Sequence, residues 1–492
     1  MGDRAGWQAP RRGPWLAWAV ATCVLAWSVL LLPGGCESAS RAPRSPGLPP
    51  SPLDGSGAGK GTATQPDAGE AVVRRQRPAP PTQRPVLPVD EPLMRIRVAE
   101  AAGDALTFSH PSGQLALRTA AAQAPRALRT PVELRRSGGG WIALEGAGSA
   151  GAQRQSLPPG DRVFIDSPAG ATGEIRFRGG AWPGAAELVA TGPEAADLVF
   201  VVPMETYLPG VISKELIKGW APETHRAQAV AARSYAACEH AWWSGRRHFD
   251  VNADQSSQAW VGATRDPVCL DAVRDTRGEY LVFDGRVVPA YFSSACGGVP
   301  ANATDSILDG TWVDIAPLQV DSARDARPKG CCEKAPTAKW KVSISCAEMA
   351  TRLNAWAVAQ GRRDLAGLGP VKSVTVAESN AAGRPSAFRI TDGAGHRAVW
   401  EAEDVRRALR EGSKDLIKSS LVTVQVGGGK VTFQGRGHGH GVGMCQYGAQ
   451  AMAKAGRGYR EILLRYYPGA SVQRSPGAAA PSQATPRAER GS

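Results

Sequence analysis

The stretch GRGHGHGVGMCQYGAQAMA (residues 435–453) sets two histidines and one cysteine among six glycines. His438 and His440 are two residues apart, so on a strand both would face the same side and could form a metal pair. Cys445 follows with histidines nearby, as a thiol nucleophile requires. The glycines favour an irregular turn whose backbone approaches a ligand or another strand closely. A metal site, a nucleophile, and a groove or scaffold are therefore three interpretations of this stretch.

A second candidate for chemistry is one carboxylate, Glu215, in the apolar segment VISKELI. Apolar surroundings raise the pKa of a carboxyl group and suit it to act as a general acid. Glu205 is the rival, but ten residues of continuous helix separate the two by about 15 Å, too far to flank one bond. We interpret Glu205 as a first-turn helix residue that is favourable to the helix dipole. The alternative for Glu215 is a solvated helix position.

The elements that must position these residues form a mixed α+β body. Short alternating runs between Met94 and Pro203, such as RVFID and GEIRFRG, predict small β-sheet units. A helical block follows, in which Pro222 stands at an expected first helical position. The predicted helices cover 204–217, 221–243, 346–359, 402–410 and 449–456. Strands are predicted within 278–295, 371–379, 386–393, 420–426 and 430–435.

Residues 1–36 have the pattern of a signal peptide or membrane anchor. A basic start precedes the uncharged run Trp15–Leu32, and LLPGGC resembles a bacterial lipoprotein box that ends at Cys36. A lipid on Cys36, an uncleaved anchor and plain secretion are three alternatives. Each of them predicts an extracytoplasmic body, either tethered in the periplasm or cell envelope or secreted.

The remaining chain divides into three parts. Residues 37–92 are rich in Pro, Gly, Ala and Ser and predict a disordered linker, and residues 473–492 predict a disordered tail. The body covers 93–472. The 58 basic and 45 acidic residues give a formal charge of +13, which suits an anionic partner such as a cell wall, or reflects ordinary surface arginine. No basic run or RNA-type aromatic motif supports a nucleic-acid partner.

Four blocks resemble the SpoIID/LytB family. They are VVPMETYLPGVISKEL (201–216), WAPETHRAQAVAARSYA (220–236), VVPAYFSSACGG (287–298) and GRGHGHGVGMCQYGAQAMAKAGRGYREILLRYYPG (435–469). The resemblance covers most of residues 94–472 in the right order. It implies a SpoIID-like α+β fold and a role in peptidoglycan outside the membrane. Some members are lytic transglycosylases that act on glycan strands without stem peptides, and others bind the wall or assist an amidase.

The resemblance also implies roles for single residues. Glu215 matches the family's catalytic glutamate. One carboxyl suffices for a lytic transglycosylase, because the 6-hydroxyl of the muramic acid itself attacks and closes an anhydro ring. Substrate contacts are expected from Arg233, Gln258, Ser294, Gly297, Gly298, His438, His440 and Gln446. An ion pair is the alternative for Arg233, and a turn position for Gln258.

Two departures from the family bear on metal binding. Some sporulation members bind zinc through a Cys…His-Cys cluster just before the glutamine, but residues 250–257 here read DVNADQSS. Ser293 also stands where many members have His. No metal and no other cofactor are therefore expected.

Seven cysteines follow the N-terminal segment. Cys296 and Cys445 stand where relatives often have Ser, which suggests a bridge between them. A metal held by Cys331, Cys332 and Cys346 is the less favoured alternative.

The sequence thus predicts a peptidoglycan lytic transglycosylase that cleaves the MurNAc–GlcNAc β-1,4 bond and leaves 1,6-anhydro-muramyl ends. A non-catalytic amidase enhancer that binds the wall is the alternative. The expected partners are glycan strands, the membrane through an N-terminal anchor or a lipid, and a cell-wall amidase.

Overall fold

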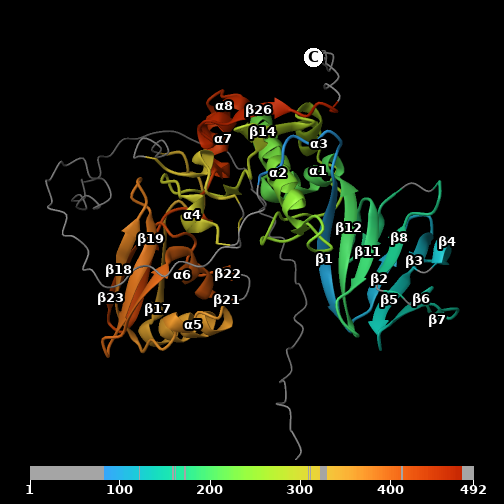
Figure 1. The fold of residues 1–492 in the computed structure, drawn as a ribbon, viewed down its shortest axis with the longest axis horizontal. Helices are drawn as coiled ribbons and strands as arrows, with labels where there is room; N and C mark the ends of the chain where they lie inside the picture. The colour runs from blue at the N-terminus through green and yellow to red at the C-terminus, as the bar shows by residue number, and fades with distance from the viewer. Residues whose placement is uncertain are drawn as a thin grey trace, which may run out of the picture. The chain divides into compact units, whose positions relative to one another are not determined.

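The computed structural model describes residues 83–120, 122–157, 160, 162–170, 173–308, 310, 312–321, 330–411 and 414–478. Figure 1 shows their helices and strands along the chain. The predicted signal or anchor, Cys36 and most of the predicted linker lie outside these residues. Among the described helices, none combines the length and hydrophobicity that crossing a membrane requires.

Two β-sheets come first in the chain, where the alternating runs predicted strands. They have strand orders β13–β1–β12–β11–β8–β3–β4 and β10–β9–β2–β5–β6–β7, and their inner residues belong to one hydrophobic core. All neighbours are antiparallel except β1 and β13. The strands are β1 (Leu93–Ala102), β2 (Leu106–Ser109), β3 (Gln114–Thr119), β4 (Ala122–Arg129), β5 (Val132–Ser137), β6 (Gly140–Glu145), β7 (Gln153–Ser156), β8 (Arg162–Asp166), β9 (Ile175–Phe177), β10 (Gly180–Trp182), β11 (Ala185–Ala190), β12 (Ala195–Pro203) and β13 (Val251–Asn252).

A helical block follows and confirms the predicted α+β class. Its longest helix, α2, begins at Pro222 as predicted, because a first helical position needs no backbone N–H and suits the fixed φ of proline. The helices are α1 (Met204–Glu215), α2 (Pro222–Trp243), α3 (Pro267–Asp275), α4 (Ala303–Ser306), the short 3₁₀ helix η1 (Ala316–Leu318), α7 (Gln446–Lys454) and α8 (Tyr459–Tyr466). The strands of this block are β14 (Glu279–Phe283), β15 (Arg286–Val287), β16 (Phe292–Ser293), β25 (Met444–Cys445) and β26 (Ser471–Arg474).

A third group of elements has a hydrophobic core of its own. Along the chain, this group lies between β16 and β25, two strands that pair with each other in parallel. Its sheets have strand orders β17–β24–β23 and β18–β19–β20, with β21–β22 as a separate pair. The elements are β17 (Trp340–Ser345), α5 (Cys346–Ala359), the 3₁₀ helix η3 (Arg363–Leu365), β18 (Val371–Ser379), β19 (Pro385–Asp392), β20 (Arg397–Glu401), α6 (Ala402–Ala408), β21 (Arg410–Glu411), β22 (Lys414–Asp415), β23 (Val422–Gly427) and β24 (Lys430–Gly435). The predicted bounds of α5, β18 and β24 agree with these.

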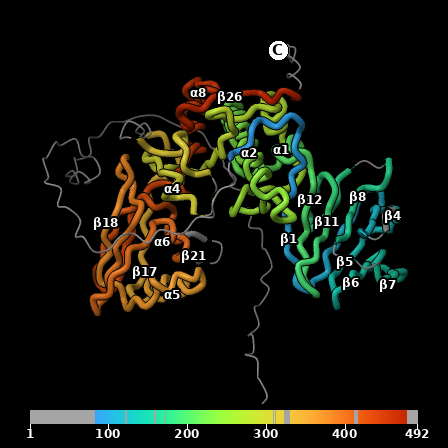
Figure 2. The backbone as a smooth tube through the Cα atoms, in the orientation of Figure 1, coloured from blue at the N-terminus to red at the C-terminus, as the bar shows by residue number. Residues whose placement is uncertain are grey.

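The ordered body extends beyond the predicted limits of 93 and 472. Arg84 is buried and donates to the carbonyl oxygens of Phe283 (2.9 Å) and Val287 (3.3 Å). At the other end, the N–H of Ser475 donates to Gly278 O (2.8 Å), and the Ser475 hydroxyl donates to Pro88 O. The two ends of the described chain therefore lie side by side near α1 (Figure 2).

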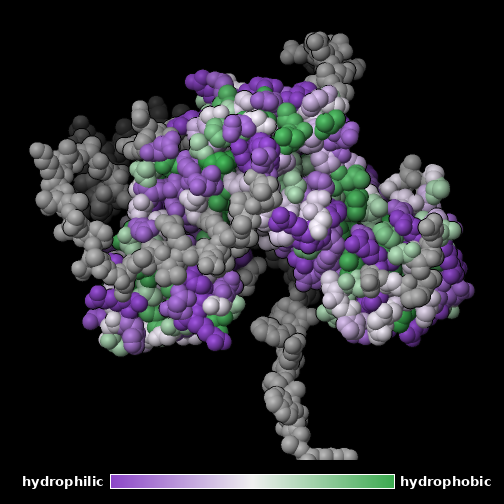
Figure 3. Space-filling view, viewed as in Figure 1, coloured by the Kyte–Doolittle hydropathy of each residue, from purple (hydrophilic) through white to green (hydrophobic). Residues whose placement is uncertain are grey.

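The face of the molecule in Figure 3 is mostly hydrophilic, with dispersed hydrophobic patches. Scattered apolar residues are normal on a protein surface and do not by themselves mark a binding site. The stronger candidates for a functional site are therefore the buried and half-buried polar groups.

Candidate active site

Helix α1 carries Glu205 in its first turn, as the sequence predicted, and it ends at Glu215, two residues before the predicted end at 217. The Glu205 N–H donates to the Glu91 carboxylate (2.9 Å), which satisfies one of the free donors at the helix start. Close packing in the middle of α1 requires a glycine, since a Cβ at Gly210 would lie 2.1 Å from Gly262 O. The residue that follows the helix, Leu216, has an extended backbone.

The Glu215 carboxyl group has two hydrogen-bond donors. The N–H of Ala259 donates to Oε1 (3.1 Å), and Gln446 Nε2 donates to Oε2 (3.3 Å). Burial raises the pKa of Glu215, while the two hydrogen bonds and Lys214 oppose that rise. A carboxyl group with a raised pKa and no arginine partner is suited to deliver a proton.

Gln446 comes from the glycine-rich stretch and is the first residue of α7. Its Nε2 also approaches Gln228 Oε1 of α2 (3.4 Å), and Gln228 is completely buried. Glu215, Gln228 and Gln446 therefore join three sequence blocks at one point. The sequence analysis missed Gln228, although it lies in a quoted block, because a helix pattern does not show which polar residue points inward.

Glu205, by contrast, forms a buried ion pair with Arg233. Arg233 Nε and Nη2 donate to the two carboxylate oxygens of Glu205 (2.9 and 2.7 Å). Arg233 is 0% exposed, and its Nη1 donates to Glu279 O (3.2 Å). The geometry thus gives Arg233 the structural ion pair that was the alternative to substrate binding.

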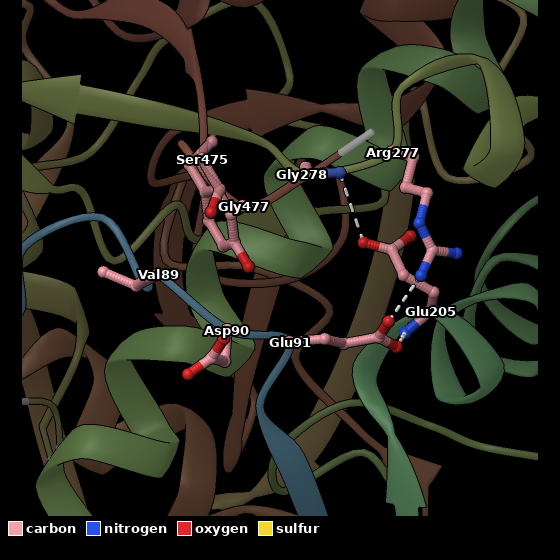
Figure 4. Close-up of a pocket in the computed structure, with 10 residues that line it drawn as sticks. Val89, Asp90, Glu91, Glu205, Arg277, Gly278, Ser475 and Gly477 are labelled. Atoms are coloured by element: carbon pink, nitrogen blue, oxygen red, sulfur yellow. Dashed lines mark hydrogen bonds and ion pairs between the residues drawn. The ribbon is translucent and has the colours of Figure 1, made fainter. Parts of the chain in front are cut away.

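A small cavity of about 190 Å³ lies at this end of α1. In Figure 4 the Glu91 carboxylate lies between Arg277 and the start of α1, and the Gly278 N–H points to Glu205. The Arg277–Glu91 distance is 2.6 Å. These pairs tie the first described residues to the helical block, so we interpret this cavity as part of the scaffold.

A larger cavity of about 580 Å³ is lined by residues of the helical block and the third group. Its wall includes Gln258, His440 and a carboxylate that the sequence analysis missed, Glu239. Burial raises the pKa of Glu239 to about 7, opposed by the Trp243 Nε1–H bond to Oε2 (3.1 Å) and by Arg247. The sequence EHAWW carried a signal for this contact. Glu239 and Trp243 stand four positions apart on one predicted helix, so their side chains lie on the same face.

Gln258 lies between this cavity and the core. Its Nε2 donates to Ala232 O (3.2 Å), and its Oε1 accepts from the Tyr207 hydroxyl (3.2 Å). Glu215 itself is absent from the lining of the larger cavity and meets its wall through Ala259, the residue after Gln258.

The glycine-rich stretch forms a tight turn against the SSACGG block. At Gly443, whose φ is 62°, a Cβ would lie 2.1 Å from Tyr291 O. Ala295 and His438 exchange backbone hydrogen bonds (3.1 and 2.7 Å). The glycines thus permit two backbones to meet, as the groove-or-scaffold interpretation required.

Both ring nitrogens of His440 have partners. Nδ1 accepts from the Val442 N–H (3.0 Å), so Nε2 carries the proton and donates to Phe292 O (2.9 Å). Burial lowers the pKa of His440 to about 4. A neutral ring with both nitrogens engaged shapes the cavity wall and does not fit the metal pair considered for His438 and His440.

The other predicted contacts belong to the same turn. Ser294 O accepts the Tyr447 N–H (3.1 Å), which fixes the start of α7. Gly297 and Gly298 both have positive φ, and a Cβ at Gly297 would lie 2.8 Å from Arg436 O. Their substrate contacts stay predictions.

Comparison with known proteins finds similarity in two segments of the chain. The family model described as SpoIID, Stage II sporulation protein, matches residues 194–283, which contain α1, α2 and Glu215. The chain therefore contains a segment, residues 194–283, that is similar to the SpoIID family. A second model, a domain of unknown function (DUF8618), matches residues 328–443.

Curated relatives of the chain are distant. An uncharacterized protein of Brachyspira hyodysenteriae is 29% identical over 270 residues, covering 55% of this chain and 66% of that protein. The amidase enhancer of Bacillus subtilis is 28% identical over 303 residues, covering 54% and 40%. Stage II sporulation protein D of Bacillus subtilis is 26% identical over 286 residues, covering 55% and 74%. The chain thus matches less than two thirds of the length of the first two relatives.

Residues 250–257, at the position where some sporulation members bind zinc, do not fit a zinc ion. Asp250 Oδ1 lies 2.5 Å from Arg95 Nη2, and its Oδ2 lies 2.9 Å from His240 Nδ1. The Asp254 carboxylate accepts the N–H of Ser256 (2.8 Å). Because Arg95 already pairs with the buried carboxylate of Asp250, residues 250–257 do not offer a set of free ligands for a metal ion.

None of the seven cysteines that the structure describes forms a disulfide. The sulfur of Cys445 accepts the Cys296 N–H (3.3 Å), so the two residues meet as expected, but Cys332 joins them: its Sγ lies 3.2 Å from Cys445 Sγ and 3.5 Å from Cys296 Sγ. The predicted two-residue bridge is therefore replaced by a cluster. Cys346 starts α5 in another core, so the alternative set of Cys331, Cys332 and Cys346 does not form.

Proposed function

We propose that this protein is a peptidoglycan lytic transglycosylase in which Glu215 acts first as acid and then as base. The observation that carries the proposal is the half-buried carboxyl group of Glu215, whose pKa is raised and whose partners are an amide and a backbone N–H. The names of the relatives, an amidase enhancer and a sporulation protein, support a role in the cell wall.

The proposed reaction needs no water and no second carboxylate. Glu215 gives its proton to the glycosidic oxygen that leaves with GlcNAc, and the bond from that oxygen to C1 of MurNAc breaks. The MurNAc 6-oxygen forms the new bond to C1, and its proton passes to Glu215. The carboxyl group thus ends protonated, as it began. Glu205 is held by Arg233 at the opposite end of α1, so we assign it no part in the reaction.

The larger cavity supports binding of a sugar polymer. Its wall offers the amide of Gln258, the indole of Trp243 and the guanidinium of Arg247. Amide groups suit sugar hydroxyls, and arginine suits the lactyl carboxylate of muramic acid. We propose that a glycan strand lies along this cavity with its reacting bond beside Gln258, next to Glu215.

The test is to incubate the purified protein with intact glycan and with glycan freed of stem peptides, and to search for 1,6-anhydro-muramyl ends by mass spectrometry. Wild-type protein is expected to form these ends, and Glu215→Gln to form them at least about 100-fold more slowly while it still binds glycan. Glu461→Gln, an exposed carboxylate on α8, serves as a control with wild-type activity. Equal turnover by Glu215→Gln and wild type would refute the assignment.

A non-catalytic amidase enhancer is the second candidate. It is favoured by the absence of Glu215 from the lining of the larger cavity, and by the printed name of one relative. This function predicts glycan binding without anhydro ends, and stimulation of a cell-wall amidase that Glu215→Gln leaves unchanged.

We further propose an extracytoplasmic location, with the body tethered by the Trp15–Leu32 segment or by a lipid on Cys36. Fractionation of cells that express the full chain or Cys36→Ala tests this. A lipid predicts that Cys36→Ala leaves the membrane fraction, and an anchor predicts that it stays. Recovery of the body from the cytoplasm would contradict the proposal.

A further inference from the structure

Four cysteines from three segments come together beside the proposed active site. Cys296 ends the SSAC segment, Cys331 and Cys332 lie in KGCCEK, and Cys445 ends the glycine-rich turn. Cys332 Sγ is 3.3 Å from Cys331 Sγ, in addition to its contacts with Cys296 and Cys445. The sulfurs of Cys296, Cys332 and Cys445 all lie within 4.8 Å of one another, and all three residues are buried.

We propose that these residues form a structural zinc site in which Cys296, Cys332 and Cys445 are ligands and Cys331 completes the tetrahedron. Four sulfurs around Zn²⁺ at about 2.3 Å have sulfur–sulfur separations of about 3.8 Å. The three separations that involve Cys332 are 3.2–3.5 Å, a few tenths of an ångström shorter than that value, whereas a disulfide would bring two sulfurs to about 2.05 Å. Cys331 lies outside the set of three sulfurs that are all within 4.8 Å of one another, so its side chain would move closer to complete the tetrahedron. Three or four sulfurs grouped around one point are better placed to bind one metal ion than to form disulfides.

Backbone groups already point at the sulfurs. The N–H groups of Cys296 and Gly448 both donate to Cys445 Sγ at 3.3 Å. Such N–H···S bonds orient a metal-bound thiolate and stabilise its charge. Cys445 also stands at the N-cap of α7, where negative charge is favoured.

A buried cation lies next to the cluster. Arg384 is 1% exposed and donates from Nη1 to the backbone oxygens of Cys296 (3.1 Å) and Val299 (2.9 Å). Its Nε donates to Ser420, and its buried Nη2 has no hydrogen-bond partner in the described part of the chain. No carboxylate therefore bonds this guanidinium, and a buried charge needs compensation. Zn²⁺ with four thiolates carries a net charge of −2 after the four thiol protons leave, and this charge would act on Arg384 together with that of the buried Glu403.

The site would fix Gln446 as well. Cys445 directly precedes Gln446, whose Nε2 donates to Glu215. Zinc at the cluster therefore holds the donor that contacts the proposed acid, although the metal lies outside the reaction. The zinc site itself does not depend on the proposed reaction, since its primary readout is metal content.

The test begins with the full chain, purified with reductant and without chelator. Metal analysis by mass spectrometry is expected to find about one zinc per chain that survives dialysis. Replacement by Co²⁺ should give the visible bands of tetrahedral thiolate coordination. Alkylation of the denatured, chelated protein should find all four cysteines as free thiols. A disulfide among Cys296, Cys332 and Cys445 together with absence of zinc would overturn the proposal, as would stoichiometric iron or copper.

Two variants separate a built site from adventitious binding. Cys332→Ser is expected to reduce zinc from about one per chain to near zero. Cys346→Ser, a buried cysteine in another core, is the matched control and should keep the metal. Equal zinc in both variants means adventitious binding and overturns the proposal. Should Cys332→Ser fail to fold, the Co²⁺ spectrum of the wild type still decides between thiolate coordination and its absence.

Discussion

The two ends of α1 hold two glutamates with opposite surroundings. Glu205 meets the fully buried guanidinium of Arg233 through two hydrogen bonds, which engage both of its carboxylate oxygens. Glu215 meets an amide and a backbone N–H, and burial raises its pKa. The comparison teaches that the nature of the partner, more than position on a helix, decides whether a buried carboxyl group serves structure or can serve proton transfer.

The largest expected effect comes from exchanging the acid. Glu215→Gln should lower the rate of glycan cleavage by about 100- to 10,000-fold, the usual contribution of a general acid. Glycan binding and the melting temperature should stay near wild type, because Gln keeps the shape. Kinetics of anhydro-end formation with a pelleting assay for binding would check this. A variant that loses binding together with cleavage would instead give Glu215 a structural role.

Removing the charge of Glu205 from its ion pair with Arg233, at the start of α1, should lower the free energy of unfolding. Glu205→Gln leaves Arg233 buried without its counter-ion, and we expect a loss of about 3–5 kcal/mol in the free energy of unfolding. Asp271→Asn removes an exposed pair with Arg274 and should cost less than about 1 kcal/mol. Denaturant unfolding of the three proteins measures both. A loss no larger for Glu205→Gln than for Asp271→Asn would contradict the comparison.

Glu239 extends the comparison to a third carboxyl group. Its pKa of about 7 in the fold exceeds the ordinary value of 4.5, so the folded protein holds a proton that the unfolded chain releases between these pH values. Stability should therefore fall as pH rises from about 4.5 to 7, by on the order of 1–3 kcal/mol. Glu239→Gln should remove this fall, and melting curves at pH 5 and pH 8 test it. An unchanged pH dependence in the variant would show that Glu239 ionises normally.

The smallest effect concerns the amide donor of Glu215. Gln446→Met removes a hydrogen bond to the carboxylate, so the pKa of Glu215 should rise further, by less than about one unit. The basic limb of the pH–rate profile would then move to higher pH. Gln450→Met, whose side chain contacts Ala221 and Thr224 instead, is the control. Carbon-13 NMR of the Glu215 carboxyl carbon gives the same pKa without activity, and a downward shift would reverse the inference.

Local signals predicted the helices and several strands well. Pro222 marks the start of α2, and the predicted segment 346–359 coincides with α5, because capping and periodicity act over a few residues. The strand orders of the two first sheets could not be predicted, since pairing such as β1 with β12 joins segments about 100 residues apart. Residues near Arg84 were assigned to the linker because composition does not reveal that a single arginine is buried.

The site was predicted in part. Family blocks pointed to Glu215 and Gln446, and the structure brings them together. They did not reveal that Arg233 is satisfied by Glu205, since that pair depends on how α2 packs on α1. Cys332 was not assigned to Cys296 and Cys445 because it lies 113 residues before Cys445. Such contacts follow from tertiary packing, which no local pattern encodes.

The parallel pairing of β16 with β25 has a consequence for modular exchange. Phe292 pairs with Met444, so the segment between these two strands begins and ends at nearly one place, and the DUF8618 match, 328–443, falls within that segment. A segment whose ends are neighbours can be swapped as a cassette without rethreading the core around it. The rest of the protein could thus accept grafts of other lengths at this junction, while β16 and β25 stay paired.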